Sequence, residues 1–563
     1  MLHFANLIEA LASAPAENPF ITFWVDEDTQ DTVSFGEFRE RARARAGLLY
    51  KEGVRPADRL IVIMPQSISA MEVFVGGMML GAVPAFLAYP NTKVEPSKYR
   101  SGLEGVTANL QAKAVVLDED FPGEMLEHLD LRGGTRLYRA GHVERWAAID
   151  EVRQPEIKSS DFAFIQHSAG TTGLQKGVAL THDAVLRQIG HLQQALKIDR
   201  ASDRIYSWLP LYHDMGLIAC FMLPMVCHLS VVMQSPTDWV MSPETMLQAI
   251  SSHRCTLAWL PNFAFQFVPR RTRLDRFDSE PDLSSLRALI NCSEPVRAKS
   301  IGEFSDAFAR LGLNSQALQS SYAMAEDVFA ITQSCLDVGP ARIWADRREF
   351  QSARRIVQVA EEAPDGLCFI SSGHLLPNHK IRIVDDSLND LRSGNVGEIL
   401  VQSDCLFSGY YNRPDLTSQV FVEGWYRTGD LGFFIDGELF VVGRQKDLII
   451  VAGENLYPQD IEEIIASHPA VHDGRVVATG SYNPQTGTED VIVVAELESE
   501  RYLGDTAIEQ ELRNLVVKGM GVAVGMIYLK PPKWIVKSTA GKPARSATLE
   551  KLLREHPELA REG

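Results

Sequence analysis

Short apolar runs alternate with helical segments through the first half of the chain, and this alternation most constrains its fold. An Ile- and Val-rich run begins at Arg59, a helical stretch starts at Ser67 and ends at Gly81, and another apolar run follows at once. Further runs of this kind begin at Ala114, Phe162, Thr256 and Arg287. Buried strands that alternate with helices are typical of a parallel α/β sheet. We therefore expect an α/β fold.

The pattern changes toward the C-terminus. After Ala363, short strands alternate with Gly, Asn and Asp turns, which indicates an antiparallel β unit. A domain boundary is expected near residues 444–447, because a short strand, a helix and two longer strands follow it as a compact α+β unit. The apolar run 216–233 is interrupted by Pro224 and His228, so we expect a buried helix and a buried strand there and no membrane span.

Charge and cysteine content narrow the classes of function. The formal charge of -18, from 55 basic and 73 acidic residues, argues against sequence-independent nucleic-acid binding, which needs a basic surface. A local run of arginines is interpreted as a solvated turn, with docking of an acidic partner as the alternative; it comprises Arg270, Arg271, Arg273 and Arg276. The 7 cysteines form no C-x-x-C pair, and no secretory signal is recognised. We expect a cytoplasmic protein with reduced thiols.

The strongest local motif is HSAGTTGLQKG at 167–177, which follows an apolar strand and precedes a helix from Thr181. Glycines let backbone N–H groups approach an anion, hydroxyls donate hydrogen bonds and Lys176 supplies charge, so the loop suits a phosphate. It is not a Walker A loop, because Gln175 precedes the lysine and Gly177 follows it. A P-loop kinase is therefore disfavoured, and a plain surface turn remains the alternative.

The loop resembles the phosphate loop of the acyl-adenylate-forming superfamily, which includes acyl-CoA synthetases, luciferases, peptide-synthetase adenylation domains and fatty acyl-AMP ligases. Further motifs of that superfamily follow in order along nearly the whole chain: SWLPLYHDMGL, WLPNFAFQF, INCSEPVR, SSYAMAED, GWYRTGDLGFF, VVGRQKDLII and STAGKPAR. Gln175 stands where the family usually has Pro, and Ala323 where Gly is more common. The resemblance implies a large domain over 1–445, made of two α/β subdomains and a small β-barrel, followed by a small mobile α+β domain over 446–563.

The resemblance also implies a reaction, in which ATP and Mg²⁺ activate a carboxylic acid to acyl-AMP and a thiol then receives the acyl group. Lys542 is the predicted catalytic lysine, because an ammonium offsets the repulsion between a carboxylate and the α-phosphate; Lys537 is the alternative. Glu326 and Thr171 would hold the magnesium ion beside the phosphates. The predicted catalytic set is completed by His213 and Lys176.

The predicted nucleotide site comes from the same motifs. By resemblance Tyr322 stacks on adenine, Asp430 accepts both ribose hydroxyls, Arg444 also contacts the ribose, and Lys446 is the interdomain hinge, although Lys446 could equally be a linker charge. The predicted ATP-binding residues are Ser168, Gly170, Thr171, Thr172, Gly173, Lys176, Ser293, Glu294, Pro295, Tyr322, Met324, Ala325, Asp430 and Arg444.

The acid pocket is predicted at two strand ends. His213 and Asp214 are expected to be exposed in a turn that follows a strand, where the family places a gate beside the acyl carboxylate; a core histidine is the alternative. Asn262 and Phe263 match the family's pocket wall, although an aromatic run is also typical of plain core. Met241, Phe263 and Phe265 would make the pocket apolar, which favours a fatty or related acid.

The acceptor is the least constrained part of the prediction. Several motifs are more similar to fatty acyl-AMP ligases than to acyl-CoA synthetases, and residues 343–366 lie where those ligases carry an insertion that hinders the movement CoA requires. This favours an acyl carrier protein, whereas AGENLYP from Ala452 resembles many CoA ligases and keeps CoA as the alternative. A non-adenylating nucleotide-binding relative and an amino-acid adenylation domain, which normally adjoins a carrier domain, are the remaining interpretations.

Overall fold

A nine-stranded sheet forms the centre of the large N-terminal domain, in the order β17-β14-β13-β12-β11-β9-β10-β1-β2. This computed structural model describes residues 4–90, 96–139, 155–167, 176–277, 279–361, 363–451, 454–483, 488–537 and 542–557. The strands are β1 (Pro19–Trp24), β2 (Gln30–Ser34), β9 (Arg204–Ser207), β10 (Ser230–Met233), β11 (Leu257–Pro261), β12 (Ala288–Cys292), β13 (Leu318–Ala323), β14 (Ala330–Gln333) and β17 (His374–Leu375). The interior of the sheet is parallel from β13 to β1, and β2, β14 and β17 pair antiparallel at its two edges.

A second, parallel sheet has the order β4-β3-β5-β6. Its strands are β3 (Arg59–Ile63), β4 (Val83–Phe86), β5 (Ala114–Leu117) and β6 (Arg136–Arg139). Beside β4 lies β7 (Phe162–His167), which pairs antiparallel with β8 (Gly177–Thr181). We expected a parallel strand at Phe162, and that was wrong. Only residues 168–176 separate the two strands, fewer than the dozen or so that a parallel crossover needs.

Helices cover these sheets, and several begin where the sequence predicts. Ser67 caps α3 (Ile68–Met79) by accepting a hydrogen bond from the Ala70 N–H, and Thr181 caps α6 (His182–Ala195) through the Ala184 N–H. The other helices of this domain, outside the segments introduced below, are α1 (Leu7–Ala12), α2 (Phe35–Lys51), α4 (Pro96–Leu110), α8 (Pro236–Met241), α9 (Thr245–His253), α10 (Ala264–Arg271) and α11 (Ala298–Phe308). One extended hydrophobic core joins the helices to both sheets.

The apolar run at 216–233 is buried within this core, as predicted. It forms a π-helix (Met215–Met222), α7 (Leu223–Cys227) and β10. His228 ends α7 in the left-handed conformation, with φ 57°. No helix in the described part of the chain has the length and apolar character that crossing a membrane requires.

An antiparallel unit follows, also as predicted, in the place of the expected small β-barrel. Its five strands are β18 (Lys380–Val384), β19 (Gly397–Gln402), β20 (Phe421–Val422), β21 (Trp425–Ile435) and β22 (Glu438–Arg444), with α13 (Pro414–Val420) between β19 and β20. The predicted insertion at 343–366 folds as an excursion of β15 (Arg342–Asp346), α12 (Arg347–Ala353) and β16 (Gly366–Ile370), in which the two strands pair antiparallel.

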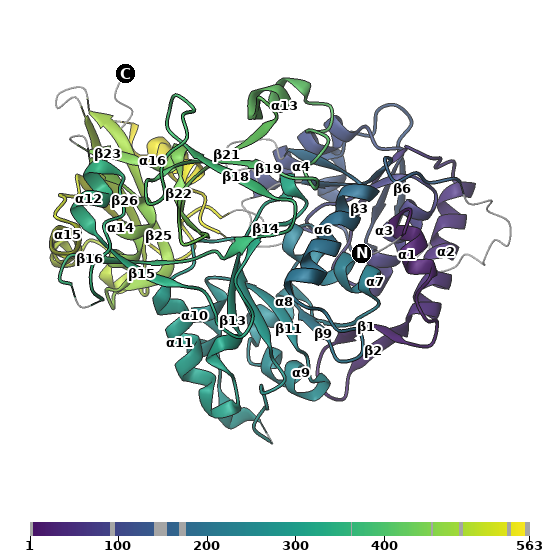
Figure 1. The fold of residues 1–563 in the computed structure, drawn as a ribbon. Helices are drawn as coiled ribbons and strands as arrows, with labels where there is room; N and C mark the ends of the chain where they lie inside the picture. Colours follow the sequence, from purple (N-terminus) through teal and green to yellow (C-terminus); the bar gives the residue numbers. More distant parts are fainter. Residues whose placement is uncertain are drawn as a thin grey trace.

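The small C-terminal domain has a hydrophobic core of its own, from Ile449 to Ile527. Its elements are β23 (Ile449–Val451), β24 (Glu454–Leu456), α14 (Pro458–Ala466), β25 (Val471–Asn483), β26 (Thr488–Leu497), α15 (Thr506–Met520), β27 (Met526–Lys530) and α16 (Arg545–Glu555). Figure 1 shows this domain at one end of the molecule, with the excursion β15–α12–β16 beside it. The boundary between 445 and 446, and the mobility of this domain, stay predictions.

Candidate functional site

A cleft of about 1390 Å³ gathers side chains from segments that are far apart in the sequence. The predicted site residues that line it are Lys176, His213, Phe263, Ser293, Glu294, Met324, Ala325, Glu326, Asp430, Arg444, Lys446 and Lys542. Five predicted residues do not line it: Met241, Asn262, Phe265, Pro295 and Tyr322. Five others lie outside the described residues: Ser168, Gly170, Thr171, Thr172 and Gly173.

The parallel sheet explains why these residues meet. His213, Phe263, Ser293 and Glu326 follow β9, β11, β12 and β13 respectively. The carboxyl ends of parallel strands share one edge of a sheet, where open α/β folds bind their ligands. Residues from four separate motifs therefore meet at a single edge.

Glu326 is held by a tyrosine that the sequence motifs do not mark. Tyr410, from the loop after β19, donates a hydrogen bond of 2.7 Å to Oε1 of Glu326. Nζ of Lys176 lies 4.7 Å from the centre of the same ring, a cation–π distance. Burial and the charge of Glu326 raise the pKa of Tyr410, so the phenol stays a donor. Tyr410 thus joins a predicted magnesium ligand to the predicted phosphate-loop lysine.

Asp430 is fixed from two directions. The Tyr322 hydroxyl donates a 2.6 Å hydrogen bond to Oδ2 of Asp430, and Nε of Arg444 lies 3.2 Å from Oδ1. Asp430 and Arg444 face each other across the β21–β22 ladder, so backbone pairing sets this ion pair. Tyr322 is buried, with burial and Asp430 raising its pKa. Its hydroxyl orients Asp430, while stacking on adenine stays a prediction.

The Lys542 side chain reaches into the large domain, where its ammonium group donates a hydrogen bond to the Ser293 carbonyl. Ser293 has a left-handed backbone, with φ 71°, which turns the chain sharply at the end of β12. Lys537, the alternative catalytic lysine, also lines the cleft. Lys542 thus contacts the strand end at which the other predicted residues meet.

His213 and Asp214 are half-buried, so the expectation that both are exposed was wrong. The reason is the π-helix that begins at Met215: the Leu217 N–H donates to the His213 carbonyl, and the Asp214 carboxylate accepts from the Met215 N–H at 2.8 Å. Burial lowers the pKa of His213 to about 4, and the charge of Lys542 acts in the same direction. The imidazole at the cleft is neutral at pH 7.

Aromatic rings form one wall of the cleft. Trp208 and Trp239 stack with ring centres 3.7 Å apart, and Phe263 lies edge-on to both at 6.3 and 6.2 Å. Trp208, Phe263 and Phe267 line the cavity. No separate signal in the sequence marks the tryptophans, because aromatic residues beside strands are typical of any core. The cleft therefore joins an apolar wall to the polar groups at the sheet edge.

Three expectations for this wall were wrong. Met241 is 78% exposed, at the end of α8. Phe265 is fully buried against Phe304, because α10 turns it away from Phe263. Asn262 is half-buried outside the cavity lining, and its amide oxygen accepts from the Asn291 amide and the Arg297 N–H.

The arginine run is only in part the solvated turn we expected: Arg270, Arg271 and Arg273 are exposed, but the first two belong to a helix. Arg270 and Arg271 form the last turn of α10 and line the cleft. Arg270 bonds Glu303 at 3.0 Å and also pairs with Asp473 of the small domain. Basic residues in the last turn of a helix interact favourably with its dipole. The ion pair between Arg270 and Asp473 is one of the contacts between the two domains.

A family model described as AMP-binding enzyme matches residues 8–411. The chain belongs to the AMP-binding enzyme family. This confirms the resemblance inferred from the motifs, and the protein is a ligase with the α/β fold of that family.

Proteins named as ligases of fatty acids are among those similar to this chain. The long-chain-fatty-acid–AMP ligase FadD32 of Mycobacterium marinum is 29% identical, over 94% of this chain and 90% of its own. JamA of Moorena producens, named a medium-chain-fatty-acid–[acyl-carrier-protein] ligase, is 30% identical, over 94% of this chain and 91% of its own. A solved structure from work on fatty acyl-adenylate ligases of E. coli and L. pneumophila has a TM-score of 0.91 at 27% identity and covers 99% of both chains.

Proposed function

We propose that this ligase converts a fatty or related apolar acid and ATP into acyl-AMP and pyrophosphate, and then passes the acyl group to the phosphopantetheine thiol of an acyl carrier protein. One observation carries the proposal. The cleft joins an aromatic wall around Phe263 to Lys542, to Glu326 and to the Asp430–Arg444 pair. An apolar wall suits the acyl chain, and the charged groups suit ATP.

In the first step a carboxylate oxygen attacks the α-phosphorus of ATP. A bond forms between that oxygen and the phosphorus, and the bond from the phosphorus to the pyrophosphate oxygen breaks. Both reactants are anionic, so an ammonium between them lowers the barrier. Lys542 supplies it, because its side chain reaches the cleft and its partner at Ser293 is a carbonyl and not a carboxylate.

The neutral imidazole of His213 adds no competing charge at the cleft. It lies beside the acid pocket and orients the carboxylate. Asp430 accepts the ribose hydroxyls, since Tyr322 and Arg444 fix its two oxygens from the protein side. Lys446 lies on the rim of the cleft, where a hinge between 1–445 and 446–563 would act. In this arrangement the ammonium group of Lys542 would lie between the carboxylate and the α-phosphate.

Glu326 fits a hard divalent cation such as Mg²⁺. Its carboxylate lines the cleft and accepts a hydrogen bond from the Tyr410 hydroxyl. Magnesium is usually bound by one or two carboxylates together with substrate phosphates. A bound Mg²⁺ would supply charge stabilisation for the leaving pyrophosphate. Thr171 is the second proposed ligand.

Contacts of the excursion support a carrier protein as the acceptor. Phe350 of α12 stacks on Tyr457 of the small domain, with ring centres 4.9 Å apart. Arg354 donates to the Asn455 side chain at 2.9 Å, and Asn455 in turn donates to the Gln351 carbonyl at 3.0 Å. These contacts tie down the small domain, whose rotation CoA would need. JamA, a relative of this chain, is named for transfer to an acyl carrier protein.

In the second step the sulfur of the thiol attacks the acyl carbonyl carbon. A carbon–sulfur bond forms, the carbon–oxygen bond to AMP breaks, and the thiol proton leaves to solvent. We would supply dodecanoate and ATP, and compare CoA with a phosphopantetheinylated bacterial acyl carrier protein; the unmodified carrier is the control. Faster acylation of the modified carrier than of CoA is expected. Preference for CoA would overturn the acceptor, and acylation of neither thiol would overturn the transfer step.

A further inference from the structure

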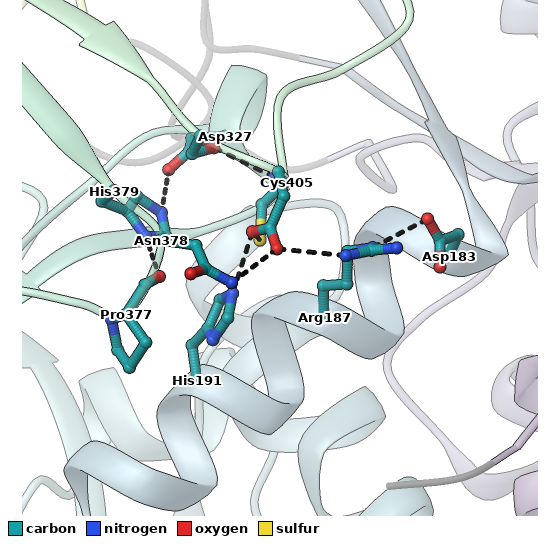
Figure 2. Close-up of polar contacts among 10 residues, drawn as sticks. Asp183, Arg187, His191, Asp327, Pro377, Asn378, His379 and Cys405 are labelled. Atoms are coloured by element: carbon teal, nitrogen blue, oxygen red, sulfur yellow. Dashed lines mark hydrogen bonds and ion pairs between the residues drawn. The ribbon is translucent and has the colours of Figure 1, made fainter. Parts of the chain in front are cut away.

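The residue next to Glu326 forms a buried ion pair that the reaction does not use. Oδ2 of Asp327 lies 2.6 Å from Nε2 of His379, and both side chains are fully buried (Figure 2). Nδ1 of His379 lies 2.9 Å from the Pro377 carbonyl, which can only accept, so that nitrogen carries a proton. Neither Asp327 nor His379 lines the cleft. Burying charged groups is costly unless they are paired, so this pair needs an explanation.

A strained turn follows directly. Val328 has φ 62° and ψ -54°, and the Phe329 N–H donates to the Asp327 carbonyl at 2.7 Å, which closes a γ-turn. A β-branched residue in this region is an outlier with a strained backbone. Such a turn persists only where its surroundings over-determine it. The buried side chain of Asp327 is placed to hold it.

The segment after β19 braces the same turn from the other side. The Ser403 hydroxyl donates to Oδ1 of Asp327, and the Phe407 N–H donates to the Glu326 carbonyl at 2.8 Å. Tyr410, further along this segment, holds the Glu326 carboxylate. One segment thus holds Glu326, through its backbone and its side chain, and also the side chain of Asp327. His379, the residue before β18, holds Asp327 from another direction.

A second polar cluster supports that anchor. Asp404 accepts hydrogen bonds from Asn378 at 2.9 Å, from His191 at 2.9 Å and from Arg187 at 3.2 Å. Asn378, next to His379, has a left-handed backbone with φ 60°. Figure 2 shows Asn378, His191 and Arg187 converging on this cluster. With the guanidinium of Arg187 on its carboxylate, Asp404 braces the loop before β18 and is not arranged as a metal ligand.

We propose that Asp327 and His379 are a positioning pair that fixes the orientation of the Glu326 carboxylate toward the cleft. The inference rests on the proposed function, because Glu326 matters only if ATP binds there. Without the pair, the turn at Val328 relaxes and Glu326 loses its direction. Removing the pair should therefore lower turnover and raise the Mg²⁺ concentration that the enzyme requires, although neither residue lines the cleft.

The test compares full-length variants in acid-dependent ATP–pyrophosphate exchange, with Mg²⁺ and ATP titrated separately. Asp327→Ala and His379→Ala should lower kcat at least tenfold and raise the Mg²⁺ concentration for half-maximal rate, whereas His379→Gln, which keeps a hydrogen-bonding group, should retain more activity. The matched control is Asp203→Asn. Asp203 is buried and forms a 2.5 Å ion pair with Arg287, and it does not line the cleft. Thermal unfolding of each variant measures the purely structural loss.

Two further variants separate positioning from stability. In a Glu326→Gln background, Asp327→Ala should cause no further loss of exchange, because the group it positions is gone. Val328→Gly should restore part of the exchange to Asp327→Ala, since glycine adopts φ 62° without strain. The inference would be overturned if Asp327→Ala lowered exchange further in the Glu326→Gln background. It would also be overturned if Asp327→Ala alone lowered exchange no more than Asp203→Asn does. If the wild type shows no exchange with any acid, the proposed function fails. The inference is then tested by the increase in melting temperature that ATP causes in the presence of Mg²⁺. A smaller increase in Asp327→Ala than in the wild type would support it, and an equal increase would overturn it.

Discussion

The hydroxyl of Tyr322 donates a 2.6 Å hydrogen bond to the carboxylate of Asp430, across 108 positions of sequence. The bond joins the end of β13, which Glu326 follows, to Asp430 on β21, whose carboxylate also pairs with Arg444 of β22. A buried hydrogen bond between two separate sheets therefore holds together the proposed nucleotide site.

Tyr322→Phe removes that hydrogen bond and leaves the ring. A hydrogen bond to a charged group contributes about 1.5–3 kcal/mol, so the KM for ATP should rise roughly 10- to 100-fold. The KM is measured in pyrophosphate exchange. Tyr482→Phe, at an exposed tyrosine of the small domain, is the control and should leave it unchanged. An unchanged KM in Tyr322→Phe would mean that Asp430 does not depend on this bond.

Lys542→Ala should cripple adenylation while leaving transfer from supplied acyl-AMP nearly intact. Loss of a single electrostatic donor typically costs roughly 3–4 kcal/mol, a decrease in kcat of about two to three orders of magnitude. Both half-reactions are measured separately, and Lys537→Ala is the matched control because Lys537 also lines the cleft. A larger adenylation defect in Lys537→Ala would transfer the catalytic role to that lysine.

Arg354→Ala should loosen the small domain. It removes the 2.9 Å bond to Asn455 while leaving the large-domain site untouched. We expect the rate with CoA to rise relative to the rate with the carrier protein. The neighbouring Arg355 pairs with Glu349 inside the excursion, so Arg355→Ala is the control and should not change this ratio. Equal ratios in both variants would remove the excursion as the reason for acceptor choice.

Phe263→Ala should change the chain length that the ligase prefers. The ring lies at the aromatic wall beside Trp208, so its removal lengthens the pocket and favours longer acids. The ratio of kcat/KM for hexadecanoate to that for octanoate should increase. Met241→Ala, at a side chain that is 78% exposed, should leave the ratio unchanged. A lower ratio in Phe263→Ala would place the acyl chain elsewhere.

Stability should fall as the pH drops from about 6.5 toward 4, partly through His182. His182 is buried, its Nδ1 accepts from the Leu7 N–H, and burial lowers its pKa from 6.5 to about 4. As the pH falls, the unfolded chain binds this proton before the folded chain does. The contribution of His182 to the free energy of unfolding is therefore complete above pH 6.5 and decreases below it, by about 2 kcal/mol at pH 5. Urea unfolding of wild type and His182→Gln at pH 5 and 7.5 measures this. An equal pH dependence in both proteins would contradict the assignment.

Motif order predicted the polar half of the site even where the motifs lie on different kinds of element: Glu326 follows the parallel strand β13, whereas Asp430 lies on the antiparallel strand β21. Glu326, Asp430 and Lys542 were found in this way, and all three line the cleft. Tyr410 escaped notice because nothing in its local sequence separates it from an ordinary loop tyrosine. Asp327 and His379 are 52 positions apart, so no local pattern could pair them.

The apolar half was harder to predict, for a physical reason. Phe263 and Phe265 are two positions apart at the start of α10, where one ring faces the cleft and the other faces the core. Hydrophobicity alone does not distinguish a pocket from a core, since both exclude water. The stacking of Trp208 on Trp239 depends on how α8 packs beside β9, which the sequence does not reveal.

Acid-dependent exchange of labelled pyrophosphate into ATP tests the central claim most directly. The purified wild-type chain is assayed with Mg²⁺, ATP and a series of straight-chain acids, with each acid omitted in turn. We predict exchange that requires the acid, that is greatest for an apolar chain, and that falls by about two to three orders of magnitude in Lys542→Ala. The absence of exchange with every acid, or exchange that proceeds equally without one, would contradict the account.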